Sequence, residues 1–217
     1  MVTLIDSYSE SNKTYDWDLN NSWGENGIGQ SFTNTNEITL DSCKFYLQRT
    51  GALTGNLTAH LYAHTGTYPS SSMPGDLLAS STAIDISTIG TSYALVTFNF
   101  TGANRVTLAA STYYIITVEP TSTTGEEDFI SCGVDEVTMG HSGALLSKFE
   151  EDWYNQYDIY DCCFYVYGEA TATGTNISLN VGDVWKDVTN AYVNVGDVWK
   201  EVASASVNVG DVWKTIF

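Results

Sequence analysis

A chain of 217 residues, of which 43% are hydrophobic and 13% aromatic, is long enough to bury a core. The length predicts one domain of ordinary size plus an appendage. Eight Lys and Arg residues stand against 26 Asp and Glu, which gives a formal net charge of -18. Because binding to phosphates depends on basic patches, the composition excludes nucleic acid and anionic membrane surfaces as expected partners.

The excess of Asp and Glu over Lys and Arg has two interpretations. It favours solubility and self-repulsion in a crowded assembly, and a cluster such as Glu126–Asp128 is also of the type that holds calcium. No spacing in the chain matches an EF-hand loop, so we favour the first reading and expect no cofactor. The first residues carry neither a basic nor an apolar signal region, and no run is long enough for a membrane helix. We therefore expect a protein that is not exported by the usual signal.

Apolar and polar residues alternate along much of the chain, which predicts β-strands. The alternation places Cys43, Phe45 and Leu47 on one face of a strand, and it does the same for Leu57, Ala59, Leu61 and Ala63 in the next strand. Clusters of Gly, Asn, Ser and Pro at 49–56, 64–76 and 100–105 predict turns. Strands are expected at 43–47, 57–64, 93–100, 105–111, 113–119, 128–134 and 162–169. About eight strands at this spacing predict an antiparallel β-sandwich of jelly-roll type.

The strongest candidate site in the sandwich is an acidic and aromatic stretch. Carboxylates at Glu150–Asp152, Asp158 and Asp161 flank aromatic rings in the same stretch. Aromatic faces beside carboxylates suit sugar hydroxyls, or calcium with a glycan. The candidate glycan-binding residues are Trp153, Tyr154, Tyr157 and Asp158. A glycosidase would need two carboxylates at a fixed separation, which the sequence does not reveal, and we expect no enzyme.

The histidines point to neither a metal site nor a catalytic site. His60, Tyr62 and His64 share one strand face, which would offer two imidazoles to a metal. Exposed polar strand faces commonly hold such residues without ligands, so we expect no metal. His141 lies in the segment "MGHSGA", which is not the G-x-S-x-G motif of a serine nucleophile.

The four cysteines leave two interpretations open. Adjacent Cys162 and Cys163 are expected on opposite faces of one strand, so at most one of them shares a layer with Cys43. One interpretation is a single disulfide formed in the sandwich after release. The favoured reading is buried free thiols that act as small hydrophobic groups. The absence of C-x-x-C makes a zinc site unexpected.

The C-terminal part of the chain repeats one short phrase three times. The copies "LNVGDVWK", "VNVGDVWK" and "VNVGDVWK" begin at residues 179, 193 and 207. Each copy predicts a β-hairpin in which Gly occupies the first position of a two-residue type II′ turn. Within each hairpin an Asn is expected to face a Trp across the strands. The repeat residues with an expected role in assembly are Asn180, Gly182, Trp185, Asn194, Gly196, Trp199, Asn208, Gly210 and Trp213.

The repeats imply assembly. A lone two-stranded hairpin is marginal in water, so the hairpins must pack on one another, on the sandwich or on other subunits, and we expect a homo-oligomer. The Trp row either stacks on sugar rings or covers neighbouring hairpins and subunits, and we favour the second. The predicted organisation is a sandwich at 1–168, a small polar linker at 169–176 and three hairpins at 177–217.

The sequence resembles a known family. The stretches "DSYSESN", "GQSFT", "LDSCKFYLQRTGALTGNLTAHLYAHTGTY", "LVTFNFTGANRVTLAASTYYIITVE" and "CFYVYGE" are similar to β-sandwich domains of tail, fibre and other virion proteins of tailed phages. Related sandwiches occur in surface-anchored bacterial proteins. The resemblance covers Asp6 to Glu169, and the terminal repeats are similar to repeats that close such phage proteins. It implies a structural or receptor-facing virion component, made in the host cytoplasm and released by lysis.

We therefore expect a non-enzymatic virion protein that serves as a decoration, fibre or tail component. It would oligomerise or dock through its hairpins, with other virion proteins and a host-surface glycan as partners. Two alternatives remain: an extracellular carbohydrate-binding module and a subunit of an extracellular filament, in which hairpins supply strands to a neighbour's sheet.

Overall fold

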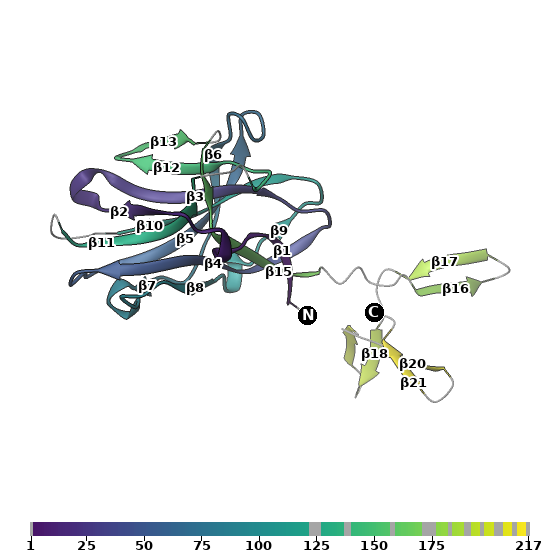
Figure 1. The fold of residues 1–217 in the computed structure, drawn as a ribbon. Coiled ribbons are helices and arrows are strands. Elements are labelled where there is room, and N and C mark those ends of the chain that lie inside the picture. Colours follow the sequence, from purple (N-terminus) through teal and green to yellow (C-terminus); the bar gives the residue numbers. More distant parts are fainter. Residues whose placement is uncertain are drawn as a thin grey trace. The chain divides into compact units, whose positions relative to one another are not determined.

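The computed structural model describes residues 2–121, 127–136, 140–156 and 159–170, together with the backbone of six strands between 177 and 215. It divides the chain into two units, Met1–Ala170 and Thr171–Phe217. Both consist of antiparallel strands, which confirms the predicted all-β class (Figure 1). No helix found in the described ranges has the length and apolar character needed to span a membrane.

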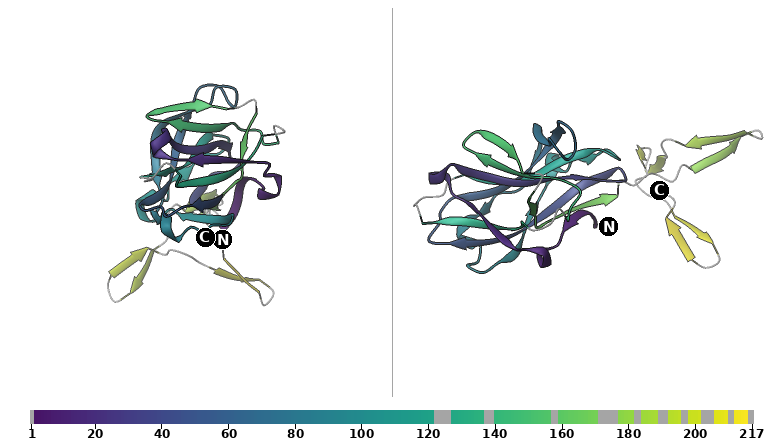
Figure 2. Two further views of the ribbon diagram at one scale, coloured as in Figure 1. Left: turned by 60° about the vertical axis from the view of Figure 1, so that its left-hand side comes forward. Right: turned by 45° about the horizontal axis from the view of Figure 1, so that its top comes forward.

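The first unit is a β-sandwich of two sheets, named here sheet A and sheet B (Figure 2). Sheet A contains β1 (Val2–Tyr8), β15 (Phe164–Ala170), β4 (Ile38–Thr50), β11 (Phe129–Asp135) and β14 (Asp161–Cys162) in spatial order, with β2 (Tyr15–Leu19) on β11 and both β8 (Ala94–Asn99) and β9 (Thr107–Leu108) on β4. Sheet B contains β13 (Asp152–Asn155), β12 (Leu145–Phe149), β3 (Glu25–Thr33), β10 (Tyr113–Pro120), β5 (Asn56–Thr65) and β6 (Met73–Ser80) in spatial order, with β7 (Ile84–Asp85) on β5. Short 3-10 turns lie at Glu10–Asn12, Asn21–Trp23, Ile86–Thr88 and Gly102–Asn104.

The core lies between the sheets and is built from the alternating faces that the sequence predicted. On β4, Phe45 and Leu47 are fully buried with Cys43, and on β5 the side chain of Leu61 is fully buried with its predicted partners Leu57 and Ala59. Phe45 meets a ring from β8 edge to face, with 6.3 Å between the ring centroids. Because each large side chain removed from water contributes about 2 kcal/mol, this alternation is a principal source of sandwich stability.

The number of strands was underestimated, since the described residues of the sandwich form fifteen strands where the sequence indicated about eight. The missed strands are β1, β2, β3, β6, β7, β12, β13 and β14. β3 shows no alternation because consecutive residues from Gly27 to Phe32 are all buried, with both of its faces covered. β6 begins inside a predicted turn and contains Pro74, which is tolerated because β6 is an edge strand. The strand expected at 105–111 shortens to β9.

The second unit contains three two-stranded hairpins. They pair β16 (Ile177–Val181) with β17 (Val184–Val188), β18 (Tyr192–Val195) with β19 (Val198–Glu201), and β20 (Ser206–Val209) with β21 (Val212–Thr215). The predicted cross-strand register is confirmed, since the structure pairs Asn180 with Trp185, Asn194 with Trp199 and Asn208 with Trp213. The turn residues Gly182, Gly196 and Gly210 lie outside the described residues. Whether the Trp side chains bind sugar or pack subunits stays a prediction.

The boundary between the units falls at the end of β15. This strand runs through Gly168 to Ala170, and its last residues pair with the start of β4. The first unit ends at the same residue.

Candidate functional site

The predicted glycan-binding residues do not form one cluster. Trp153 and Tyr154 are consecutive on β13, so their side chains point to opposite faces of the strand. Trp153 stands opposite Lys148 of β12, whereas Tyr154 stands opposite Ser147 and is 47% exposed. Tyr157 and Asp158 lie outside the described residues.

Trp153 instead meets Tyr62 of β5. Their ring centroids are 6.2 Å apart in an edge-to-face arrangement. Leu61 faces the core, so the adjacent Tyr62 lies on the outer face of sheet B. Trp153 contacts Tyr62 and therefore lies on the same face. In the strand order β13-β12-β3-β10-β5, three strands separate the two residues.

This contact requires strong curvature of sheet B. Four strand spacings amount to about 19 Å in a flat sheet, which two aromatic side chains cannot span. The edge strands β6 and β13 also contact each other, although they stand at opposite ends of the strand order (Figure 1). The outer face of sheet B is therefore concave, and side chains from its two halves meet above β3.

Two glycines of β3 make this approach possible. A Cβ atom added at Gly27 would lie 3.0 Å from Cγ of Glu119, 3.3 Å from Cβ of Lys148 and 3.4 Å from Cη2 of Trp153. A Cβ atom at Gly29 would lie 2.4 Å from the backbone oxygen of Ile116. Because glycine leaves this space free, the neighbouring side chains close over the middle strand of the face.

Glu119 of β10 connects these side chains. Its Oε1 atom accepts hydrogen bonds from the hydroxyl groups of Tyr62, at 2.9 Å, and Thr117, at 3.0 Å. Its Oε2 atom accepts a hydrogen bond from Nζ of Lys148 at 2.9 Å. The same Nζ lies 5.8 Å from the ring centroid of Trp153. We name these five residues, Tyr62, Thr117, Glu119, Lys148 and Trp153, the Glu119 cluster.

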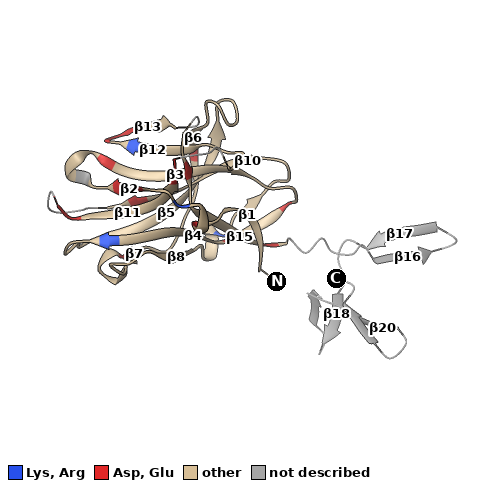
Figure 3. Ribbon diagram, viewed as in Figure 1, with Lys and Arg blue, Asp and Glu red and all other residues tan. Residues whose placement is uncertain are grey.

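The Glu119 cluster is partly open to solvent. The ion-paired side chains of Glu119 and Lys148 are 13% and 20% exposed, and Thr117 beneath them is fully buried. Burial, together with the charge of Glu119, raises the pKa of Tyr62 well above its usual value. The Tyr62 hydroxyl therefore stays protonated and donates to the carboxylate. Figure 3 shows the basic segment of β12 in a sandwich where acidic residues predominate.

The histidines of β5 extend the same outer face. His60 lies beside Tyr62, with 6.1 Å between the ring centroids, and its Nδ1 atom is 2.9 Å from Oγ of Ser80. Nε2 of His64 is 2.8 Å from Oγ of Ser72. Burial lowers the pKa of both imidazoles, so they are neutral near pH 7. Over the described ranges, no three His, Cys, Asp or Glu side chains are grouped to hold a metal ion.

The loop between β5 and β6 covers one end of this face. The Tyr68 ring stacks on that of Tyr113 of β10, with 4.1 Å between centroids. Nδ2 of Asn155 donates to the backbone oxygens of Pro69, at 3.1 Å, and Ser72, at 3.0 Å. These contacts attach the loop to β13, next to Trp153, and so help to hold the curvature of the sheet.

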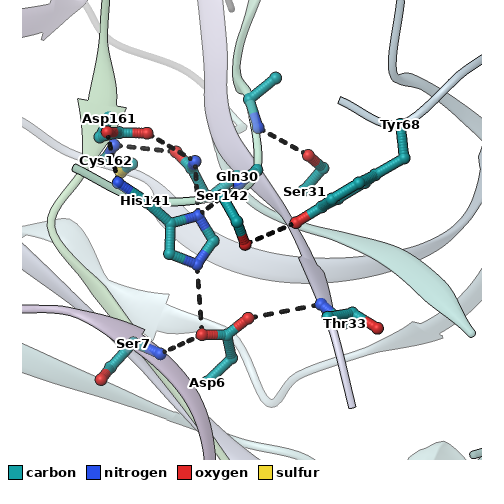
Figure 4. A network of polar contacts seen from close by, with 12 residues as sticks. Asp6, Ser7, Gln30, Ser31, Thr33, Tyr68, His141, Ser142, Asp161 and Cys162 are labelled. Carbon is teal, nitrogen blue, oxygen red and sulfur yellow. Dashed lines mark hydrogen bonds and ion pairs between the residues drawn. The ribbon is translucent and has the colours of Figure 1, made fainter. Parts of the chain in front are cut away.

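A second polar cluster surrounds His141, in the loop between β11 and β12 (Figure 4). Nδ1 of His141 accepts a hydrogen bond from the backbone N–H of Gly143 at 2.9 Å and is 3.2 Å from Nε2 of Gln30. Nε2 of His141 is 3.2 Å from Oδ1 of Asp6. Since Nδ1 faces two N–H donors, we assign the proton to Nε2, which donates to Asp6.

Asp161 completes the His141 network. Its Oδ2 atom accepts from the backbone N–H groups of Gly140 and His141, each at 2.9 Å, and its Oδ1 atom accepts from Gln30 at 3.1 Å. Burial raises the pKa of Asp161, although these hydrogen bonds oppose the shift. Because the network connects β1 and β14 of sheet A with β3 of sheet B, it fastens the two sheets together.

The His141 network does not have the geometry of a nucleophilic triad in the part of the chain that the structure describes. There the side chain of His141 has hydrogen-bond partners in Asp6, Gln30 and Gly143, none of which supplies a hydroxyl or thiol group. The sequence singled out His141 but gave no signal for Gln30 or Asp6, which are distant in the chain.

The four cysteines are buried and unpaired in the structure. The expectation that Cys162 and Cys163 lie within one strand is wrong, because β14 ends at Cys162 and β15 begins at Phe164. Cys163 lies at the change between two partner strands, because its N–H donates to the backbone oxygen of Gly133 on β11 while its carbonyl oxygen accepts from the Tyr46 N–H on β4. Both cysteines are consequently fully buried.

Comparison with known proteins does not identify a family. No family model matches the chain, and no curated protein matches it. Among solved structures, the chain is similar to the cysteine protease and lectin-like domains of Cwp84, a surface layer associated protein of Clostridium difficile, with a TM-score of 0.40 and 13% identity. The match covers 68% of this chain and 32% of that chain, so it spans about a third of the other protein's chain. A likeness at this level assigns no function.

Proposed function

We propose that this protein is a non-enzymatic carbohydrate-binding β-sandwich that holds a glycan on the concave outer face of sheet B. The observation that carries the proposal is the Glu119 cluster, in which Trp153 and Tyr62 meet beside a carboxylate and an ammonium group. Sugar rings pack their C–H faces against aromatic rings, while their hydroxyl groups exchange hydrogen bonds with charged and polar side chains.

The charges favour a neutral glycan over an acidic one. Lys148 is the cation of the cluster, and its charge is balanced by Glu119. The chain as a whole carries a formal charge of -18, which repels uronic and sialic acids. Two donor protons of the Lys148 ammonium group remain for sugar hydroxyls after the bond to Glu119.

The test is a screen of the purified chain against an array of neutral and acidic glycans, followed by calorimetric titration of the best ligand. Trp153→Ala is expected to abolish binding, because it removes the ring on which the sugar packs. Tyr154→Ala is the matched control, since Tyr154 occupies the same strand and is exposed on the other face. Equal loss of affinity in both variants, with circular dichroism unchanged, would exclude the proposed face.

A second proposal concerns where the protein acts. Three hairpins with one register, together with the resemblance over Asp6 to Glu169, favour a structural component of a phage particle. Isolated hairpins are marginally stable, so we propose that they assemble with other copies or with other virion proteins. A glycan-binding sandwich suits the receptor-facing position that this proposal implies.

Light scattering on the full chain and on a chain ending at Ala170 tests the assembly role. A homo-oligomer that becomes a monomer on truncation supports it, and a monodisperse monomer in both cases contradicts self-assembly. Immunogold microscopy of a lysate of the native source, with antibodies against the sandwich, tests the location. Regular label on phage particles supports the virion role, whereas label confined to cell surfaces or filaments excludes it.

A further inference from the structure

Two cysteines of sheet A lie in direct contact. Sγ of Cys132 on β11 is 3.4 Å from Sγ of Cys162 on β14, and both side chains are fully buried. The two strands are antiparallel neighbours, with Val134 paired with Cys162. We propose that Cys132 and Cys162 form a disulfide when the chain folds under oxidising conditions, so that this pair is an oxidation site of the sandwich.

The geometry selects this pair from the four cysteines. A disulfide requires the sulfur atoms to approach to about 2.05 Å, so each sulfur of the pair has to move by less than about 1 Å. Among the cysteines that the structure describes, Cys132 and Cys162 are the pair with a contact between sulfur atoms.

The reaction is expected during folding, before the pair is enclosed. The thiolate is the reactive form, and burial raises the pKa of Cys162 well above its usual value. The closed, reduced sandwich therefore reacts slowly with an oxidant. A chain whose β14 has not yet docked on β11 exposes both thiols to solvent.

The oxidant is a low-molecular-weight disulfide such as oxidised glutathione. One cysteine thiolate attacks it, forming a mixed disulfide and releasing one glutathione thiolate. The second cysteine thiolate then attacks the protein sulfur of the mixed disulfide, which forms the Cys132–Cys162 bond and releases the second glutathione. The two protons of the cysteines pass to the released thiolates, and two electrons pass to glutathione, so the protein loses two protons and two electrons, which together equal two hydrogen atoms.

The bond would constrain a defined part of the fold. Its ends are 30 positions apart in the chain, and the enclosed segment contains β12 and β13. These strands form one edge of sheet B and carry Lys148 and Trp153. The disulfide would tie this segment to β11 of sheet A in the folded and unfolded states alike. The inference rests on the thiol contact and is independent of glycan binding.

The test compares the full chain refolded from guanidinium in a glutathione redox buffer with the chain refolded in excess reductant. Intact mass measurement is expected to show the loss of two hydrogen atoms in the first sample, and peptide mapping is expected to link Cys132 with Cys162. Cys43→Ser and Cys163→Ser are expected to keep this loss, and Cys162→Ser is expected to abolish it.

Peptide mapping of the wild-type chain decides the question even if a variant fails to fold. A wild-type chain that stays fully reduced in the redox buffer, a bond from Cys132 to Cys163, or a bond that involves Cys43 would each overturn the proposal.

Discussion

Replacing Glu119 with Ala removes the acceptor that three side chains of the outer face share. The bond to Lys148 joins partly buried charges, and its loss costs about 1.5 kcal/mol after allowance for solvent screening. Thr117 is fully buried, so leaving its hydroxyl without this acceptor costs about 1 kcal/mol more. The Tyr62 hydroxyl turns to water at a smaller cost. We expect Glu119→Ala to lower the free energy of unfolding by about 3 kcal/mol.

Urea unfolding followed by Trp fluorescence measures this loss. Glu151→Ala is the matched control, because Glu151 is an exposed carboxylate beside β13, and we expect a change within about 0.5 kcal/mol. Combining Glu119→Ala with Lys148→Met in a double-mutant cycle should give a coupling energy of about 1 kcal/mol. A Glu119→Ala variant as stable as the Glu151→Ala control would refute the view that this carboxylate organises the concave face.

Three further outcomes follow from the same structure. Gly29→Ala places a Cβ atom 2.4 Å from the backbone oxygen of Ile116 and should cost about 2 kcal/mol in urea unfolding, whereas Gly90→Ala, whose nearest neighbour is 3.5 Å away, should cost far less. Burial lowers the pKa of His60 below 6.5 in the folded chain. The stability that the neutral imidazole contributes is therefore complete above this value and is lost as pH falls through the lower folded pKa. Between pH 7 and 5 the wild type should lose more unfolding free energy than His60→Gln, and an equal loss in the two proteins would contradict this. The proposed disulfide, which closes a loop across 30 positions, should raise the unfolding free energy by about 3.5 kcal/mol over the reduced protein, and unchanged urea midpoints with and without reductant would contradict that magnitude.

The parts of the fold that the sequence predicted are those in which one strand face meets the core. On β4 and β5, alternation follows burial because the other face is polar and more exposed, so Phe45 and Leu61 stand out. β3 gave no such signal, because its outer face is covered by neighbouring side chains and carries Gly27 and Gly29 in place of polar residues. Alternation of apolar and polar residues identifies strands that have one buried and one exposed face, but it does not identify strands whose two faces are both covered.

The sequence predicted single residues of the candidate site but not their arrangement in space. The sequence drew attention to Trp153 in an acidic stretch and to Tyr62 between two histidines, but it gave no reason to place them together. Their contact depends on the curvature of sheet B, which arises from the packing of whole strands. Glycines at alternate positions of one strand were the available signal, since they mark a face where other side chains approach closely. Glu119 was missed because an isolated Glu at a strand end resembles any surface carboxylate.

Binding of a glycan at Trp153 on sheet B can be followed residue by residue in an NMR titration. The chain has six Trp residues, so a 15N spectrum offers their indole N–H signals, with that of Trp153 assigned from a Trp153→Phe variant. On addition of the best neutral glycan, we expect shifts in the Trp153 indole signal and in the backbone amides of Gly27 and Lys148. Shifts confined to the indole signals of Trp185, Trp199 and Trp213, with the Trp153 signal unmoved, would contradict it and assign binding to the hairpin repeats.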